Sequence, residues 1–147
     1  MIVEVGSDFQ ECSVLKGASC AFGVFDGVHL GHRFIIEKAL EDAQRREAPS
    51  AIITFAQDPD ETFRPDKLKK LMSNDYRLRV LDELGATYVL ALPPTREFFS
   101  LSPQAFLQNV FANNIPASLH VGNDFHFGAK AQGSVATMTS WGALRGM

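Results

Sequence analysis

Short apolar runs alternate with amphipathic stretches along this chain. Buried strands are predicted over residues 19–24, 51–55, 87–92 and 118–121, where mainly apolar or β-branched residues lie between turn-forming ones. Helices are predicted over residues 31–46, 75–84 and 103 to about 112, and the residues after Gly133 are also expected to be helical. Strands alternating with helices predict an α/β fold, a parallel sheet with helices on both faces.

Local signals mark the ends of two predicted helices. Ser73 can cap the helix over residues 75–84, and Gly85 is a suitable C-terminal stop. Ser102 followed by Pro103 places a cap residue before a proline at the first helical position. The long polar stretch between residues 55 and 70 contains prolines and is predicted to be a loop.

The segment that joins the first strand to the first helix contains Gly23, Gly27 and Gly31. Glycines allow the backbone to approach a ligand closely and to adopt conformations that other residues avoid. The free N–H groups and the positive end of the following helix attract an anion. Because ligands of parallel sheets bind beyond the carboxyl ends of the strands, this turn is predicted to be a phosphate site.

Two histidines, His29 and His32, lie three residues apart at the start of the predicted helix. At this spacing both side chains can reach the same phosphate oxygens. Paired histidines alone would equally fit a solvated first turn, and together with Asp26 they could form a metal site. H-x-x-H without a third ligand at a matching spacing is weak evidence for zinc, so phosphate binding is the favoured interpretation.

Familiar glycine-rich motifs are not found in the sequence. It has no G-x-x-x-x-G-K-S/T for P-loop chemistry and no G-x-G-x-x-G for a dinucleotide cofactor. The motif that is present reads G-x-F-D-G-x-H-x-G-H. It resembles the adenylyltransferase module of the bacterial bifunctional riboflavin kinase/FAD synthetases, within the nucleotidyltransferase superfamily. The shorter H-x-G-H is shared with that superfamily as a whole.

Three further blocks carry the same resemblance. Residues 52–65 are similar to the family's T-F-x-P-H-P…F-x-P stretch, and residues 81–93 to its L-x-x-L-G-x-D-x-V-x-x-L-P. Residues 121–128, followed by Gly133, are similar to V-G-x-D-F-x-F-G…G. The order and spacing of the blocks agree from about residue 18 to the end of the chain.

The resemblance implies a Rossmann-like nucleotidyltransferase fold and transfer of AMP from ATP to FMN, giving FAD and pyrophosphate with Mg²⁺. It implies that His29 and His32 contact the ATP phosphates, that Gly23, Gly27 and Gly31 allow close approach, and that Phe25 walls the site. Asp26 is expected to bind a backbone N–H in the turn or to help orient the nucleotide. Positioning and charge stabilisation are expected to dominate catalysis.

The resemblance also suggests roles for residues after the second and fourth strands. Asp124 is a candidate Mg²⁺ ligand, although a loop aspartate also commonly forms an Asx-turn. Phe125 and Phe127 are candidates to face the flavin ring, Phe127 more than Phe125, and otherwise pack in the core. Phe55 and Pro59 are expected to form the opposite wall. Arg64 is either a partner of the acceptor phosphate or a solvated loop cation.

Composition is consistent with a soluble enzyme and limits its partners. A chain of 147 residues suits one domain, 1–147, that buries roughly two-thirds of its unfolded surface. The net charge of −3 provides no basic field for nucleic acid or an anionic membrane. No apolar run approaches the length of a membrane span, and the N-terminus lacks a signal-peptide pattern. Cys12 and Cys20 match no metal spacing. Cys20 lies in the first apolar run and is expected to be a small buried residue, as a reducing, cytoplasmic location permits; the oligomeric state is left open.

The chain departs from the family pattern in several places. Gln57-Asp58-Pro59 replaces P-H-P, His126 stands where a lysine or arginine is usual, and Ser134 replaces an acid. The sequence stops at Met147, before the family's I-S-S-T-x-x-R segment and before the riboflavin kinase module. We therefore expect a C-terminally truncated transferase domain. The alternatives are a non-catalytic nucleotide- or flavin-binding relative, and a nucleotidyltransferase with another acceptor, such as a phosphopantetheine-like or nucleoside phosphate.

Overall fold

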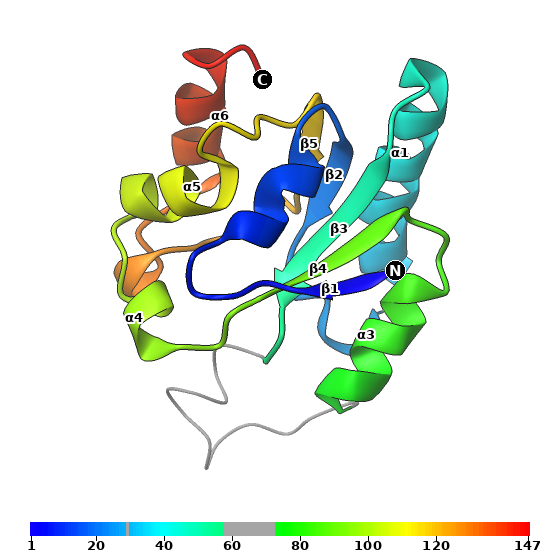
Figure 1. Cartoon of the computed structure of the whole chain (residues 1–147), viewed down its shortest axis with the longest axis horizontal. Coiled ribbons are helices and arrows are strands. Elements are labelled where there is room, and N and C mark those ends of the chain that lie inside the picture. Colours follow the sequence, from blue (N-terminus) through cyan, green and yellow to red (C-terminus); the bar gives the residue numbers. More distant parts are fainter. Residues whose placement is uncertain (29, 58–72) are drawn as a thin grey trace.

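The protein forms a parallel sheet between two layers of helices (Figure 1). The computed structural model describes residues 1–28, 30–57 and 73–147. In these residues the sheet contains β1 (Ile2–Glu4), β2 (Ser19–Phe22), β3 (Ser50–Phe55), β4 (Tyr88–Leu92) and β5 (Ser118–His120). The strand order is β1-β4-β3-β2-β5, and all neighbouring strands are parallel. The predicted α/β class and parallel sheet are confirmed.

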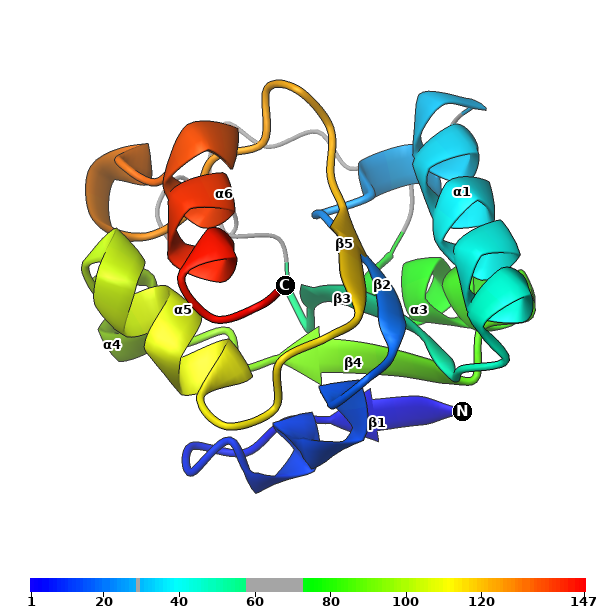
Figure 2. The ribbon, with the colours of Figure 1, turned by 90° about the horizontal axis from the view of Figure 1, so that it is seen from above.

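Helices cover both faces of the sheet, as Figure 2 shows from above. One face carries α1 (Leu30–Arg46) and α3 (Asn74–Asp82). The other carries α4 (Arg96–Phe99), α5 (Pro103–Phe111) and α6 (Val135–Ala143). The 3₁₀ segments are η1 (Gln10–Leu15), η2 (Asp26–Val28) and η3 (Ala129–Ala131). None of the helices in the described ranges is long and apolar enough to cross a membrane.

The core has two parts because the strands are apolar on both faces. Along β3, Ala51, Ile53 and Phe55 belong to the cluster beneath α4–α6, whereas Ile52 belongs to the cluster beneath α1 and α3. Side chains alternate between faces in a strand, so a continuous apolar run serves both layers. Cys20 is fully buried in the first cluster, as the sequence suggested, and burial raises the pKa of its thiol.

The predicted helix ends agree with the structure to within two residues. The Ser73 hydroxyl accepts a hydrogen bond from the Tyr76 N–H at 3.2 Å, and Ser102 accepts from Ala105 N–H at 3.1 Å. Gly85 follows α3 with φ 99°. A serine oxygen at these positions satisfies an N–H group that has no partner within the helix.

Five short elements of the described residues were missed by the sequence analysis: β1, η1, η2, α4 and η3. β1 and α4 are only three and four residues long, too short to produce a periodic pattern. β1 is an edge strand beside β4, and Thr95 caps α4 by accepting from Phe98 N–H at 3.2 Å. These additions extend the sheet and the α4–α6 layer without moving the predicted site.

Candidate functional site

The turn after β2 lies at the carboxyl edge of the sheet. Gly23 N–H donates to the Ile53 carbonyl at 3.1 Å and so extends the pairing of β2 with β3 by one residue. The backbone then becomes left-handed, with φ 55° at Phe25 and φ 75° at Gly27. The Phe25 ring folds back over Gly23, where a Cβ atom would lie 3.0 Å from the ring. A side chain at position 23 would press on the ring, so glycine favours this arrangement, which places the Phe25 ring over the turn.

A cavity of about 460 Å³, here called the polar cavity, opens beside this turn. It lies between the turn, the first helical turn of α1 and the loop after β5. His32 contributes from α1, and its ring meets the Phe25 ring edge-on at 5.4 Å between centroids. The full lining is Phe22, Gly23, Val24, Phe25, Asp26, His32, Ile35, Gly122, Asp124, Phe125 and His126.

Most of the residues predicted to bind the nucleotide line the polar cavity: Gly23, Phe25, Asp26 and His32. Asp124 and Phe125, predicted for metal and flavin, line the same cavity. Gly27 and Gly31 shape the turn and the helix start but do not line it. His29 lies outside the described residues, as do Pro59 and Arg64.

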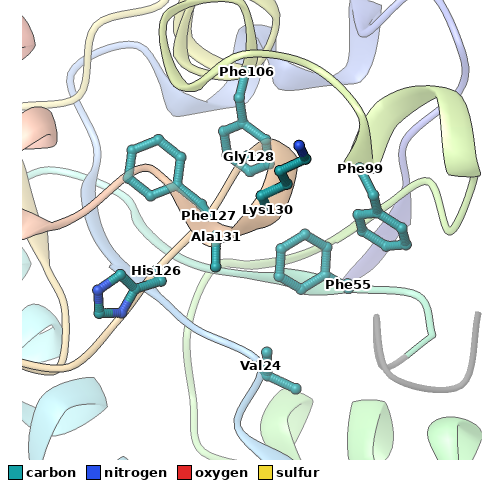
Figure 3. Close-up of a pocket in the computed structure, with 9 residues that line it drawn as sticks. All are labelled: Val24, Phe55, Phe99, Phe106, His126, Phe127, Gly128, Lys130 and Ala131. Carbon is teal, nitrogen blue, oxygen red and sulfur yellow. The ribbon is translucent and has the colours of Figure 1, made fainter. Parts of the chain in front are cut away.

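A second cavity of about 440 Å³ adjoins the first and is lined mainly by aromatic rings (Figure 3). We call it the apolar cavity. Phe55 and Phe127, both predicted to contact flavin, line it, whereas Phe125 does not. Its lining is Val24, Phe55, Phe99, Phe106, His126, Phe127, Gly128, Lys130 and Ala131. A flat aromatic ligand would find stacking partners here.

Buried rings hold the walls of the apolar cavity in place. Phe55 packs edge-on against Phe99 at 5.5 Å, and Phe106 packs against Phe127 at 5.1 Å. Phe127 also exchanges two backbone hydrogen bonds with Gly133, where a Cβ atom would lie 2.6 Å from the Phe127 ring. Phe127 is only 4% exposed, so it combines the core role and the cavity role that the sequence analysis weighed against each other.

Val24 and His126 line both cavities and mark the place where they meet. The His126 Nδ1–H donates to the Asp124 carbonyl oxygen at 2.6 Å. This bond fixes the tautomer of a neutral His126, which leaves Nε2 for another partner. The departure from a lysine or arginine therefore puts an imidazole at the junction of the cavities.

Arg77 is a residue of this region that the sequence analysis missed. It comes from α3 and is 2% exposed. Its guanidinium donates to the Val24 carbonyl at 3.0 Å, to the Thr54 hydroxyl at 2.8 Å and to the Phe55 carbonyl at 2.6 Å. The available signal was its spacing, since Arg77 precedes the buried Leu81 by four residues and so lies on the apolar stripe of the helix.

Asp124, the predicted Mg²⁺ ligand, is exposed and lines the polar cavity. Among the described residues no three His, Cys, Asp or Glu side chains come together as a metal site. Asp26 and His32 are among these residues, whereas His29, which the zinc interpretation also required, lies outside them. Ser134, the other departure, caps α6 in a reciprocal pair with Thr137.

The chain is similar to several known proteins. A family model described as FAD synthetase matches residues 11–147. The bifunctional riboflavin kinase/FMN adenylyltransferase of Escherichia coli (strain K12) is 35% identical over 120 residues, covering 80% of this chain and 38% of that protein. The Haemophilus influenzae protein of the same description is 30% identical over 130 residues, covering 85% of this chain and 41% of that protein. The chain thus spans about two-fifths of the length of these relatives.

A solved structure described as a macrolide-efflux protein from Streptococcus pneumoniae has the same fold. It superposes with a TM-score of 0.76 and covers 95% of this chain and 46% of that one. The sequence identity is 22%, so this likeness concerns the fold alone.

Proposed function

Because the chain belongs to the FAD synthetase family, we propose that residues 1–147 form an FMN adenylyltransferase domain. It would transfer AMP from ATP to FMN and release pyrophosphate. The observation that carries the proposal is the pair of adjoining cavities, one polar beside a glycine-rich turn and one lined by aromatic rings. A reaction that joins a nucleotide to a flavin needs both environments side by side.

The flavin ring would occupy the apolar cavity, between Phe55 and Phe127. Its phosphate would then point to the junction at Val24 and His126. ATP would lie in the polar cavity with its phosphates at the glycine turn and the start of α1. Holding both substrates this way converts a two-molecule encounter into an oriented step.

In the chemical step an FMN phosphate oxygen attacks the α-phosphorus of ATP. The bond from that phosphorus to the oxygen bridging to the β-phosphate breaks, and pyrophosphate leaves with the bonding electrons. His32, together with His29, would donate hydrogen bonds to the charge that develops on the phosphate oxygens. The backbone around Gly27 and the N-terminus of α1 would add N–H donors and a favourable dipole.

A Mg²⁺ ion is expected to accompany ATP. Magnesium in nucleotide sites is held by one or two carboxylates together with substrate phosphates and water, so an exposed aspartate at the cavity mouth fits it. Asp124 would hold the ion, with Asp26 lining the same cavity. The ion would supply neutralisation of charge on the leaving pyrophosphate.

The test is formation of FAD from FMN, ATP and Mg²⁺, separated from FMN by chromatography. Riboflavin in place of FMN should give no product, because it lacks the attacking phosphate. Binding of FMN and ATP without turnover would instead support a non-catalytic binding module. Turnover with a phosphopantetheine-like or nucleoside phosphate, but not with FMN, would overturn the assigned acceptor.

A further inference from the structure

Arg77 has the largest of the fully buried side chains in the described parts of the molecule. Burying a guanidinium is costly unless its N–H groups find acceptors. Three of its acceptors are at the carboxyl ends of two strands: Val24 beyond β2, and Thr54 and Phe55 at the end of β3. A buried guanidinium therefore joins two strand ends at the edge of the sheet where the cavities lie.

The Val24 carbonyl is the centre of this arrangement. It accepts from Arg77 at 3.0 Å and from the Thr54 hydroxyl at 3.0 Å. The pairing of β2 with β3 ends at Phe22 and Ile53. One further hydrogen bond, from the Gly23 N–H to the Ile53 carbonyl, extends it. Past that bond, Arg77 and Thr54 connect the two strand ends through their side chains.

These contacts matter because of what the connected residues line. Val24 lines both cavities, and Phe55 forms a wall of the apolar one. A shift of Val24 relative to Phe55 would change the direction in which one cavity opens into the other. In a reaction governed by alignment, a misplacement of about 1 Å can reduce the rate by about 10²-fold.

We propose that Arg77 is a positioning residue for the transfer reaction and acts with Thr54 through the Val24 carbonyl. It keeps the two cavities aligned so that the acceptor phosphate meets the α-phosphate in line. This role rests on the proposed function. The proposal predicts that loss of the Arg77 or Thr54 hydrogen bonds reduces kcat more than it weakens the binding of either substrate.

The test compares Arg77→Lys and Thr54→Val with wild type in steady-state assays. Lysine keeps the charge but cannot donate to three acceptors in a fixed plane, and valine keeps the shape of threonine without its hydroxyl. We expect kcat to fall by about 10–100-fold while each KM changes by less than about threefold. Arg79→Met is the matched control, since Arg79 is exposed on the same helix beside Tyr76.

An unchanged kcat per folded molecule, with only a lower Tm, would show that Arg77 is merely structural. If Arg77→Lys does not fold, Thr54→Val decides the question alone. If the wild-type chain makes no FAD, the proposed function fails. Amide NMR spectra then still test whether the Thr54 hydroxyl and Arg77 hold the turn in place. Thr54→Val should then shift or broaden the amide signals of residues 23–28 relative to Arg79→Met, and unchanged signals would refute the proposal.

Discussion

Two buried charges hold opposite ends of the sheet, and they do so in different ways. At the carboxyl ends, Arg77 of α3 donates to oxygens of Val24, Thr54 and Phe55. At the amino ends, Asp42 of α1 accepts from the hydroxyls of Ser19 and Ser118. Ser19 and Ser118 are register partners at the starts of β2 and β5, so each charge bridges a helix and two strand ends.

The surroundings of the two charges differ. Arg46 and Arg45 also donate to Asp42, at 2.9 and 3.0 Å, and complete a network made of protein groups. Arg77 instead lies beside a left-handed turn and two cavities of about 440 and 460 Å³. Protein groups therefore fill the surroundings of Asp42 at the amino end, whereas the carboxyl end borders two cavities.

The strongest test of this contrast uses two histidines, one that lines the polar cavity and one whose ring lies beside Asp42. His32→Ala should lower the rate of FAD formation by about 10²-fold or more, because it removes a donor to the transferring phosphate. His120→Ala is the control, because the His120 ring belongs to the Asp42 network and lies 3.3 Å from the Ser118 hydroxyl. It should leave the rate per folded molecule unchanged. Equal rate losses in the two variants would contradict the division between the two ends.

Asp42→Asn tests the other half of the contrast, the role of the amino end in stability. It should lower the free energy of unfolding by about 2 kcal/mol, since charge-assisted hydrogen bonds to a buried carboxylate are weakened. Activity per folded molecule should remain at the wild-type level. Urea unfolding at pH 7 measures the effect, with Glu41→Gln on the exposed face of the same helix as the matched charge control. A rate loss without destabilisation would argue against the structural role of this network.

Low pH should also remove the stability that the Asp42 carboxylate contributes to the wild-type protein. Hydrogen bonds from Ser118, Arg46 and Ser19 hold the pKa of Asp42 well below its usual range, against the opposing effect of burial. Because Asp42 has the higher pKa in the unfolded chain, about 3.9, its protonation favours unfolding as the pH falls. The stability gap between wild type and Asp42→Asn should be full above about pH 5 and shrink below about pH 4. A gap that stays constant from pH 7 to pH 3 would contradict this assignment.

The contrast also explains which features the sequence could predict. The apolar runs predicted four strands, and Ser73 and Ser102 predicted two helix starts, because these signals are local. The glycine turn was likewise visible in the sequence. Its position at the carboxyl edge follows from the general rule for parallel sheets.

Tertiary contacts were beyond such reasoning. Arg77 and Asp42 read as ordinary polar positions on helices, and the strand residues that they contact are distant in the sequence. Phe55 lies 22 residues from Arg77, and Ser19 lies 23 residues from Asp42. The division of the aromatic residues between two cavities was also hidden. Phe125 and Phe127 are two residues apart, yet one lines the polar cavity and the other the apolar cavity.

The smallest effects should come from two glycines that share a left-handed backbone. Gly27 has φ 75° in the turn, and Gly17 has φ 72° just before β2, with open space around its would-be Cβ. Alanine at either position should cost about 1 kcal/mol of stability, because a side chain is strained in this conformation.

Only Gly27→Ala should also affect ligands. Displaced N–H groups at the turn should weaken ATP binding by about tenfold, the equivalent of about one hydrogen bond. Gly17→Ala shares the backbone strain but lies at the amino end, so its ATP affinity should match wild type. Calorimetric titration of both variants with ATP and Mg²⁺, beside their unfolding curves, separates strain from site geometry. If both lose ATP affinity equally, the turn has no special role in binding and backbone strain alone accounts for the result.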